Sequence, residues 1–149
     1  MEIIGTISEI IKHKGAQVWS VAPETTVFDA ITLMAEKNVG ALLVLSGDGL
    51  VGIVSERDYT RKVALKGKAS KQTAVGEIVS QPVISASPRH SVADCMKLMT
   101  ENRVRHLPVL EGERVVGVVS IGDLVNWIIS AQSATIDQLE NFLSGNYPG

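Results

Sequence analysis

The chain repeats itself at an offset of 65 residues. Residues 23–58 align without a gap on residues 88–123, and 16 of the aligned positions are identical. A repeat of this length is one supersecondary unit that cannot bury its apolar face alone. We therefore expect two copies packed on each other about a pseudo-twofold axis. A cleft between two related units is also a common place for a small ligand.

Composition places the chain among soluble globular proteins. At 149 residues it forms one domain, or two half-domains that share a core, and with 45% apolar but only 4% aromatic residues that core is aliphatic. A net charge of −2 offers no attraction for nucleic acid or an anionic membrane. No apolar run approaches the roughly 20 residues of a spanning helix, and the first residues lack the regions of a signal peptide. A cytoplasmic protein without membrane contact is expected.

Nothing in the sequence predicts catalysis or a metal site. His13, His90 and His106 are the only histidines, and none has a metal-ligand spacing to another His, Cys or carboxylate. No phosphate-binding loop, dinucleotide fingerprint or nucleophile elbow is present. The single cysteine, Cys95, cannot form an internal disulfide, and its place on the apolar face of an expected helix suits a small buried hydrophobe.

Apolar spacing and turn signals predict the same order of elements in each copy: strand, helix, strand, strand, helix. In the first copy they are an extended segment over 18–21, a helix capped by Thr26, strands over 41–45 and 50–54 around a tight turn at 46–49, and a helix from Ser55 towards Gly67. In the second copy they are an extended segment over 83–85, a helix capped by Ser91, strands over 106–110 and 115–119, and a helix from Ser120.

Further segments flank the two copies. Thr6 with Glu9 reads as a capping box and Gly15 as a stop, which predicts an N-terminal helix. The expected division is 1–17 for this helix, 18–66 for the first repeat, 67–82 for a polar linker, 83–130 for the second repeat, and 131–149 for a C-terminal helical extension. The extension carries an apolar stripe, expected to pack on the N-terminal helix or on another chain, made of Ile136, Leu139, Phe142 and Leu143.

The strongest local signal is a twin motif where a strand ends and a helix begins. It reads GIVSERD over 52–58 and GVVSIGD over 117–123. The serine occupies the helix cap, and the aspartate lies on the first turn, where it could accept two hydrogen bonds from a ribose diol. The same spacing is close to a capping box, so a purely structural role for Ser55 with Asp58 and for Ser120 with Asp123 stays open.

The repeat, its order of elements and the G-h-h-S-x-x-D ending resemble a tandem pair of CBS domains, the module named after cystathionine beta-synthase. The segment NRVRHLPV over 102–109 is also typical of that family, and the resemblance covers residues 18–130. It implies an α+β fold of two β-α-β-β-α repeats packed sheet to sheet with pseudo-twofold symmetry, plus N- and C-terminal helical segments. It also implies a stand-alone regulatory module rather than an enzyme.

The family resemblance further implies a ligand. Such pairs bind AMP, ADP, ATP, or in some cases NAD or S-adenosylmethionine, in clefts between the repeats, and none of these serves as a catalytic cofactor. By the family pattern Asp58 and Asp123 hold the ribose hydroxyls, and Ser55 and Ser120 contact ribose or phosphate. Each cleft borrows a wall from the other repeat. Asp58 would face Val83, Ile84, Val104, Arg105, His106 and Pro108. Asp123 would face Val18, Trp19, Thr25, Val39, Gly40 and Leu43.

The two expected clefts differ in charge. The Asp58 cleft gathers Arg57, Arg105 and His106, with Arg61 and Arg103 nearby. The Asp123 cleft has neutral residues at the matching positions, namely Asn38, Gly40, Ala41 and Gly122. Because arginine supplies paired donors to a phosphate, a phosphorylated nucleotide is predicted to prefer the Asp58 cleft. The alternative is that these arginines only cover exposed helix and strand ends.

Other choices remain open at this stage. Trp19 could stack on a base or fill the core, whereas Trp127 suits packing or an interface. A basic stretch over 61–71 suits a solvated surface, and a nucleic-acid contact there lacks an aromatic platform. Two functions compete: a sensor of adenosine nucleotides that signals to an unknown downstream protein, and a structural or interaction dimer with vestigial clefts. A homodimer is expected under either, since such pairs commonly associate into flat discs.

Overall fold

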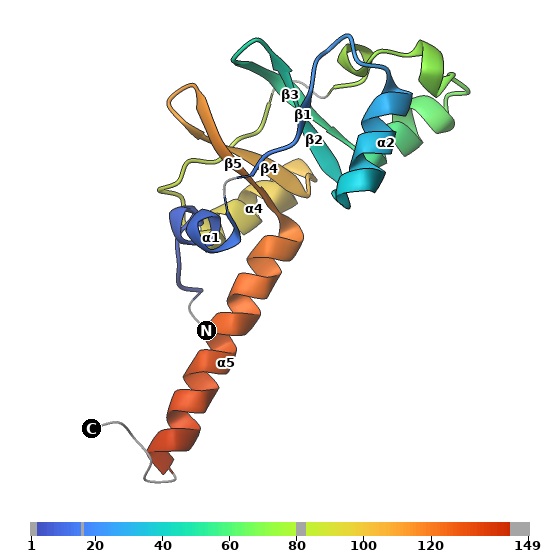
Figure 1. The fold of residues 1–149 in the computed structure, drawn as a ribbon. Helices are drawn as coiled ribbons and strands as arrows, with labels where there is room; N and C mark the ends of the chain where they lie inside the picture. The colour runs from blue at the N-terminus through green and yellow to red at the C-terminus, as the bar shows by residue number, and fades with distance from the viewer. Residues whose placement is uncertain (1–2, 16, 80–82, 144–149) are drawn as a thin grey trace.

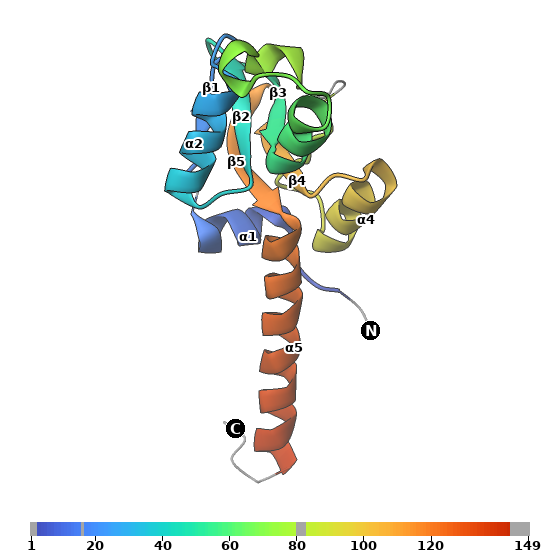
Figure 2. The same ribbon diagram turned by 90° about the vertical axis from the view of Figure 1, so that its right-hand side faces the viewer.

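The computed structural model describes residues 3–15, 17–79 and 83–143. It contains two hairpin-centred repeats that form one body, from which a long helix projects (Figure 1). Figure 2 shows the same projection from the side, so the helix leaves the body in both views. The α+β architecture predicted from the sequence is confirmed, because each repeat combines a small sheet with helices.

The first repeat is built on a three-stranded sheet. Strand β1 runs parallel to β2, and β2 pairs antiparallel with β3. Its elements are β1 (Ser20–Val21), α2 (Val27–Lys37), β2 (Ala41–Ser46), β3 (Gly49–Ser55) and α3 (Glu56–Tyr59), which continues as a π-helical turn over Thr60–Ala64. Gly47 takes φ +62° in the hairpin turn, a conformation that favours glycine. This turn was predicted from the sequence.

The second repeat reproduces the first in register. Its elements are α4 (Val92–Asn102), β4 (His106–Glu111), β5 (Arg114–Ser120) and α5 (Ile121–Leu143). The register of each hairpin shifts at the same place, between Val44 and Leu45 and between Val109 and Leu110. One prediction was wrong: residues 83–85 form no strand, and the counterpart of β1 is a single parallel bridge between Ala86 and Val109.

The helix caps predicted from the sequence are confirmed. The side-chain oxygens of Thr6, Thr26 and Ser91 each accept a hydrogen bond from the backbone N–H three residues further on, at 3.0 to 3.4 Å. Such a bond satisfies one of the unpaired donors of the first helical turn. The N-terminal helix α1 (Ile7–Lys14) therefore begins where its capping signal predicted, and Gly15 follows its last residue with φ +96°.

Each repeat completes its core with the segment that precedes the other repeat in the chain. Helix α1 joins the second repeat, where Ile7 and Ile10 are buried beside Val92, Cys95 and Leu107. The supposedly polar linker instead packs on the first repeat. Its short 3-10 helices, Ser70–Gln72 and Val75–Glu77, precede Ile78, and Val75 and Ile78 are buried in that repeat's core. The exchange ties the two halves together.

Helix α5 does not stop at the end of the second repeat. It runs unbroken for 23 residues, and its start packs against α1 through Trp127, whose Nε1 donates to the carbonyl of Ile4 at 2.9 Å. Leu139 and Leu143 are 59% and 83% exposed, so they do not pack on the N-terminal helix, and the alternative, packing on another chain, stays a prediction. The side chains of Ile136 and Phe142 lie outside the described part. Among the described residues no helix is long and apolar enough to span a bilayer.

Candidate functional site

Two cavities open beside the twin motifs, one at the start of α3 and one at the start of α5. The first has a volume of about 760 Å³ and the second about 400 Å³. The first is lined by Gly40, Ile53, Ser55, Glu56, Arg57, Asp58, Arg61, Lys62, Val83, Ile84, Asn102, Arg103, Val104, Arg105 and His106. The second is lined by Lys14, Gly15, Gln17, Val18, Trp19, Asn38, Val39, Gly40, Ala41, His106, Val118, Ser120 and Asp123. We call them the Asp58 cleft and the Asp123 cleft.

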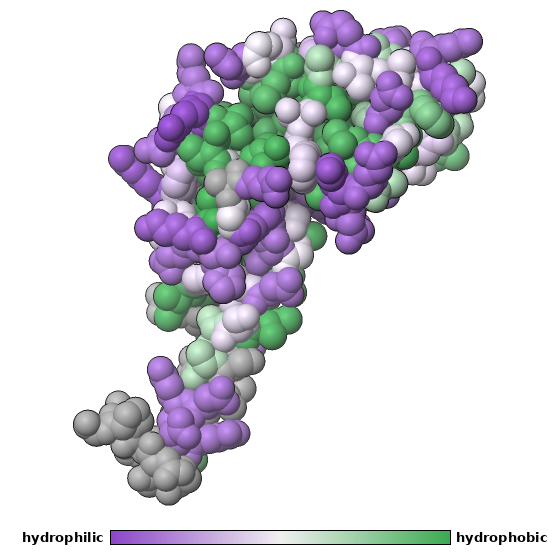
Figure 3. All heavy atoms as spheres, viewed as in Figure 1, coloured by the Kyte–Doolittle hydropathy of each residue, from purple (hydrophilic) through white to green (hydrophobic). Residues whose placement is uncertain are grey.

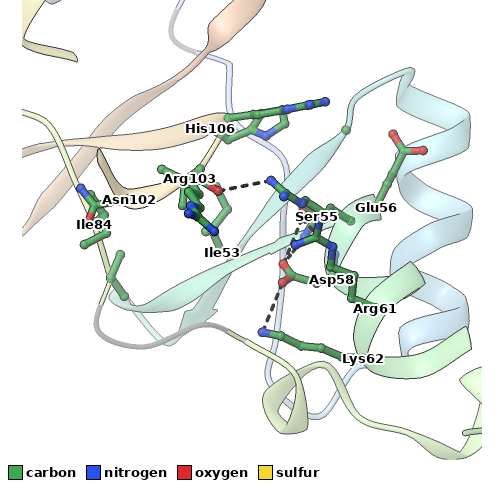
Figure 4. Close-up of a pocket in the computed structure, with 15 residues that line it drawn as sticks. Ile53, Ser55, Glu56, Asp58, Arg61, Lys62, Ile84, Asn102, Arg103 and His106 are labelled. Atoms are coloured by element: carbon green, nitrogen blue, oxygen red, sulfur yellow. Dashed lines mark hydrogen bonds and ion pairs between the residues drawn. The ribbon is translucent and has the colours of Figure 1, made fainter. Parts of the chain in front are cut away.

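In the Asp58 cleft the aspartate both caps a helix and faces the cavity (Figure 4). The Ser55 backbone N–H and hydroxyl donate to Asp58 Oδ2 at 2.9 and 3.0 Å, and Lys62 Nζ lies 3.2 Å from Asp58 Oδ1. The structural role that the sequence left open is therefore present. It does not exclude a ligand role, because this carboxylate is also part of the cavity wall.

Cations from both repeats converge on the Asp58 cleft. Arg57, Arg61 and Lys62 come from the end of the first repeat, whereas Arg103 and Arg105 come from the loop after α4. Figure 4 shows Arg103 and His106 across the cavity from Asp58 and Lys62. The Arg57 guanidinium donates to the Arg103 carbonyl at 3.3 Å and so links the two repeats across the opening. Arg61 and Arg103, which the sequence placed only nearby, line the wall itself.

The Asp123 cleft has the same helix cap but a different cation. The Ser120 N–H donates to Asp123 Oδ2 at 2.8 Å, as in the first motif. Lys14 Nζ lies 2.5 Å from the same oxygen and donates to the Val118 carbonyl at 2.8 Å. Sequence reasoning missed Lys14, because it comes from α1, which has no counterpart in the repeat. The positions that match the arginines are neutral, but Lys14 adds a cation that the charge comparison between the repeats did not include.

His106 and Gly40 line both cavities, so a thin wall separates them. A Cβ atom on Gly40 would lie 3.4 Å from His106 Cε1 and Nε2, so glycine allows the close approach of the ring. Burial, followed by nearby Lys14, lowers the pKa of His106 from its usual 6.5; Arg105 acts in the same direction, and Asp123 and Glu56 oppose it. The uncharged imidazole is thereby favoured.

Most predicted wall residues lie where the family pattern put them, but three do not. Pro108 and Leu43 occupy matching positions on β4 and β2, and both are buried. Neither lines a cavity among the described residues. Thr25 is held by the turn before α2, where its hydroxyl accepts from the Ala22 N–H at 3.2 Å. All three take part in packing or local structure, and their contact with a ligand stays a prediction.

The two tryptophans differ in their surroundings. Trp19 lines the Asp123 cleft and also packs against the first repeat's core, with Lys37 Nζ 4.4 Å from the ring centroid. Both roles considered for it are therefore geometrically available. Trp127 packs at the base of α5 directly over Gly5, where any side chain would collide with the indole. Its predicted packing role is confirmed.

Cys95 is fully buried in the second repeat's core, as its helical position predicted. Burial, with a smaller effect of Asp94, raises the pKa of its thiol to about 11, so it is inert as a nucleophile at neutral pH. Within the described ranges no three His, Cys, Asp or Glu residues gather where they could hold a metal ion.

The fold and its paired clefts define a module of two related repeats rather than a single-site domain. The chain belongs to the CBS domain family, whose model matches it twice, over residues 6–65 and 75–130. The family resemblance inferred from the sequence is confirmed.

Individual relatives support this assignment. The mitochondrial CBS domain-containing protein CBSX3 of Arabidopsis thaliana is 38% identical over 95% of this chain and 73% of its own. A solved CBS-domain protein of Burkholderia ambifaria, described as a signal-transduction protein, is 49% identical, with a TM-score of 0.83 over 86% of this chain and 96% of its own. A hexameric CBS-CP12 protein from bloom-forming cyanobacteria is 30% identical, with a TM-score of 0.73 over 84% and 72%.

Proposed function

We propose that this protein is a regulatory module that binds a phosphorylated adenosine ligand, such as AMP, ADP, ATP or NAD, in the Asp58 cleft. One observation carries the proposal: five cationic side chains from both repeats line the same cavity as a carboxylate at a helix start. S-adenosylmethionine, which carries no phosphate, ranks behind these ligands. The signal-transduction description of the Burkholderia relative agrees with a regulatory role.

The wall supplies a group for each part of such a ligand. Asp58 accepts hydrogen bonds from the ribose hydroxyls, and Arg103 and Arg105 offer forked donors to phosphate oxygens. Val83, Ile84 and Val104 provide apolar surface for the base. A cavity of about 760 Å³ is within the usual range for small-molecule sites.

Signalling requires that the ligand favour one arrangement of the repeats over another. The position of the Asp58 cleft supports this, because its walls belong to different repeats, which Arg57 bridges through the Arg103 carbonyl. A phosphate that draws Arg57 and Arg105 together would change how the repeats sit. The downstream protein that would read this change is not specified by the site.

The test is a thermal-shift screen with AMP, ADP, ATP, NAD, NADH and S-adenosylmethionine, on protein shown to be free of carried-over nucleotide. A ligand at 100 times its Kd should add about 2.7 kcal/mol to the free energy of unfolding and raise the Tm by several degrees. A shift with a phosphorylated ligand supports the proposal. Absence of any shift would favour the alternative, a structural or interaction dimer with vestigial clefts.

We also propose that the protein self-associates as a homodimer. Exposed apolar side chains follow α5 from the body outward: Val125, Ile129, Leu139 and Leu143. Figure 3 shows hydrophobic residues beside polar ones along this helix, below the body. Sedimentation equilibrium should give twice the monomer mass, and Ile129→Glu should weaken the association. A hexameric relative is compatible with assembly, and a monomer at all concentrations would contradict it.

Location stays a prediction. The sequence favoured the cytoplasm, and one relative is a mitochondrial protein.

A nucleic-acid role for the basic stretch is not proposed. Lys62 donates to the Ile78 carbonyl at 2.9 Å and Lys71 lies over the Phe28 ring, so both have intramolecular partners.

A further inference from the structure

Lys14 joins the N-terminal helix to the carboxylate of the Asp123 cleft. Its Nζ lies 2.5 Å from Asp123 Oδ2 and donates to the Val118 carbonyl at 2.8 Å. The lysine side chain is 35% exposed and the aspartate 24%, so the pair is half-buried at the cavity wall. The ammonium group therefore sits where a ligand hydroxyl would reach this aspartate.

We propose that Lys14 latches the Asp123 cleft, so that a ribose can engage Asp123 only after Lys14 has been released. This rests on the proposed function in one respect: it takes the aspartate of the twin motif as the ribose ligand. A diol that donates to both oxygens of the carboxylate must displace Lys14 from Oδ2, or share an oxygen that the Ser120 N–H also uses. We call the contact of Lys14 with Asp123 the latch.

Helix α1 is anchored firmly enough to hold Lys14 in place. The N–H groups of Ile7 and Ser8 donate to the carbonyls of His90 and Pro88, both at 2.9 Å. On the next turn Ile11 packs so closely on Gly117 that a side chain there would lie 2.5 Å from its Cδ1. Opening the latch thus requires rotation of the Lys14 side chain, not movement of the helix.

The corresponding ion pair in the Asp58 cleft is arranged differently. Lys62 also pairs with its aspartate, at 3.2 Å, but it belongs to the same helical segment four residues on. It approaches Oδ1, while the Ser55 N–H and hydroxyl donate to Oδ2. The latch instead joins residues 109 apart in sequence. It therefore makes the two clefts unequal in affinity, with the Asp58 cleft filling first.

The sign of a charge substitution distinguishes the latch from simple electrostatics. If Lys14 only attracts anions, its removal weakens binding of a phosphorylated ligand to the Asp123 cleft. If it is a latch, removal strengthens binding, and does so most clearly for uncharged adenosine. Lys12 provides a matched control, because it is exposed on the same helix, carries the same charge and lines neither cavity.

The experiment measures adenosine and AMP binding by calorimetry in the full-length Asp58→Asn protein, which leaves the Asp123 cleft as the intact site. Adding Lys14→Met should raise adenosine affinity about fivefold, since a partly exposed ion pair and one hydrogen bond are lost as competitors. Adding Lys12→Met instead should change it less than about twofold. Adding Asp123→Asn to the Lys14→Met protein should abolish the gain.

The measured affinities either support the latch or overturn it. Affinity that is unchanged or lowered by Lys14→Met relative to Lys12→Met overturns the latch, as does binding too weak to measure in both. If Lys14→Met lowers the Tm sharply, Lys14→Gln, which keeps a donor without the charge, replaces it. Failure of the proposed function looks different: wild-type protein would bind nothing through Asp58, whereas Lys14→Met would still open the second cleft.

Discussion

The Asp58 and Asp123 clefts are built on one plan and yet offer different chemistry. Both aspartates receive the N–H of a capping serine, at 2.9 and 2.8 Å, and both hairpins have the same register shift. The difference lies in the side chains added at matching positions. Arg57 stands opposite Gly122 in the repeat alignment, and Arg105 opposite Gly40. The shared backbone makes two clefts; differences at matching positions give one of them several arginines, while the other receives Lys14 from α1.

The largest expected effect comes from removing one aspartate at a time. Asp58→Asn should weaken AMP binding by roughly tenfold to a hundredfold, because hydrogen bonds to a charged acceptor are lost. Asp123→Asn should change the first binding event far less. Calorimetry with AMP measures both. The two variants lose equivalent helix caps, so each controls for the other's effect on stability. Equal losses of AMP affinity in the two variants would contradict the claim that AMP prefers the Asp58 cleft.

The next effect separates phosphate from ribose recognition. Arg105→Ala should lower AMP affinity about tenfold but adenosine affinity less than about twofold, since the guanidinium is expected to meet only the phosphate. The ratio of the two affinities is the measurement. Arg89→Ala, an exposed arginine outside both cavities, is the control. A proportional loss for both ligands would assign Arg105 to general packing instead.

Adding an arginine to the second motif tests whether the charge at this position favours AMP. Gly122→Arg places in the Asp123 cleft the residue that the first motif has at position 57. A Cβ on Gly122 meets only the Ser120 hydroxyl, at an ordinary 3.6 Å, so the backbone accepts the change. AMP affinity of the Asp123 cleft in the Asp58→Asn background should rise roughly threefold. No gain would mean that position 57 does not contribute to phosphate binding.

The smallest effect concerns the wall that both clefts share. Because the pKa of His106 is lowered in the folded protein, the unfolded chain binds a proton more readily as the pH falls below 6.5. Stability should therefore be unaffected by His106 above that pH and decline below it, by less than about 1.4 kcal/mol per pH unit. Urea unfolding between pH 7.5 and 5.5 measures this.

His106→Gln should flatten part of that pH dependence, and His13→Gln, which removes an exposed histidine from α1, serves as the control. Stability that rises on acidification in the wild type, and loses that rise in His106→Gln, would show that the charged imidazole is favoured instead. That result would contradict the burial argument for this wall.

Most helices, strands and turns could be predicted from the sequence because they depend on local signals. Thr6, Thr26 and Ser91 indicate helix starts because their side chains can cap a helix. The glycines at 46–49 indicate the hairpin turn. The repeat offset then transfers each expectation to the second copy. The family resemblance, and not a local signal, placed Asp58 and Arg105 in one cleft, and both residues line it in the structure.

What the sequence could not predict depends on contacts between distant segments. The bond between Lys14 and Asp123 joins α1 to the second repeat, and no spacing signals it. The burial of Val75 and Ile78 in the first repeat's core was hidden because their segment follows a polar stretch. Leu43 and Pro108 were assigned to cleft walls by the family pattern, but both are buried at matching strand positions and line neither cavity.

The central claim is that a phosphorylated adenosine ligand fills the Asp58 cleft first. The most direct measurement is a crystal structure with AMP supplied at one equivalent per chain. The account predicts density in the Asp58 cleft, with the ribose hydroxyls on the Asp58 carboxylate and the phosphate against Arg105, while Lys14 still bonds Asp123. AMP in the Asp123 cleft with the Asp58 cleft empty, or equal occupancy of both, would contradict it.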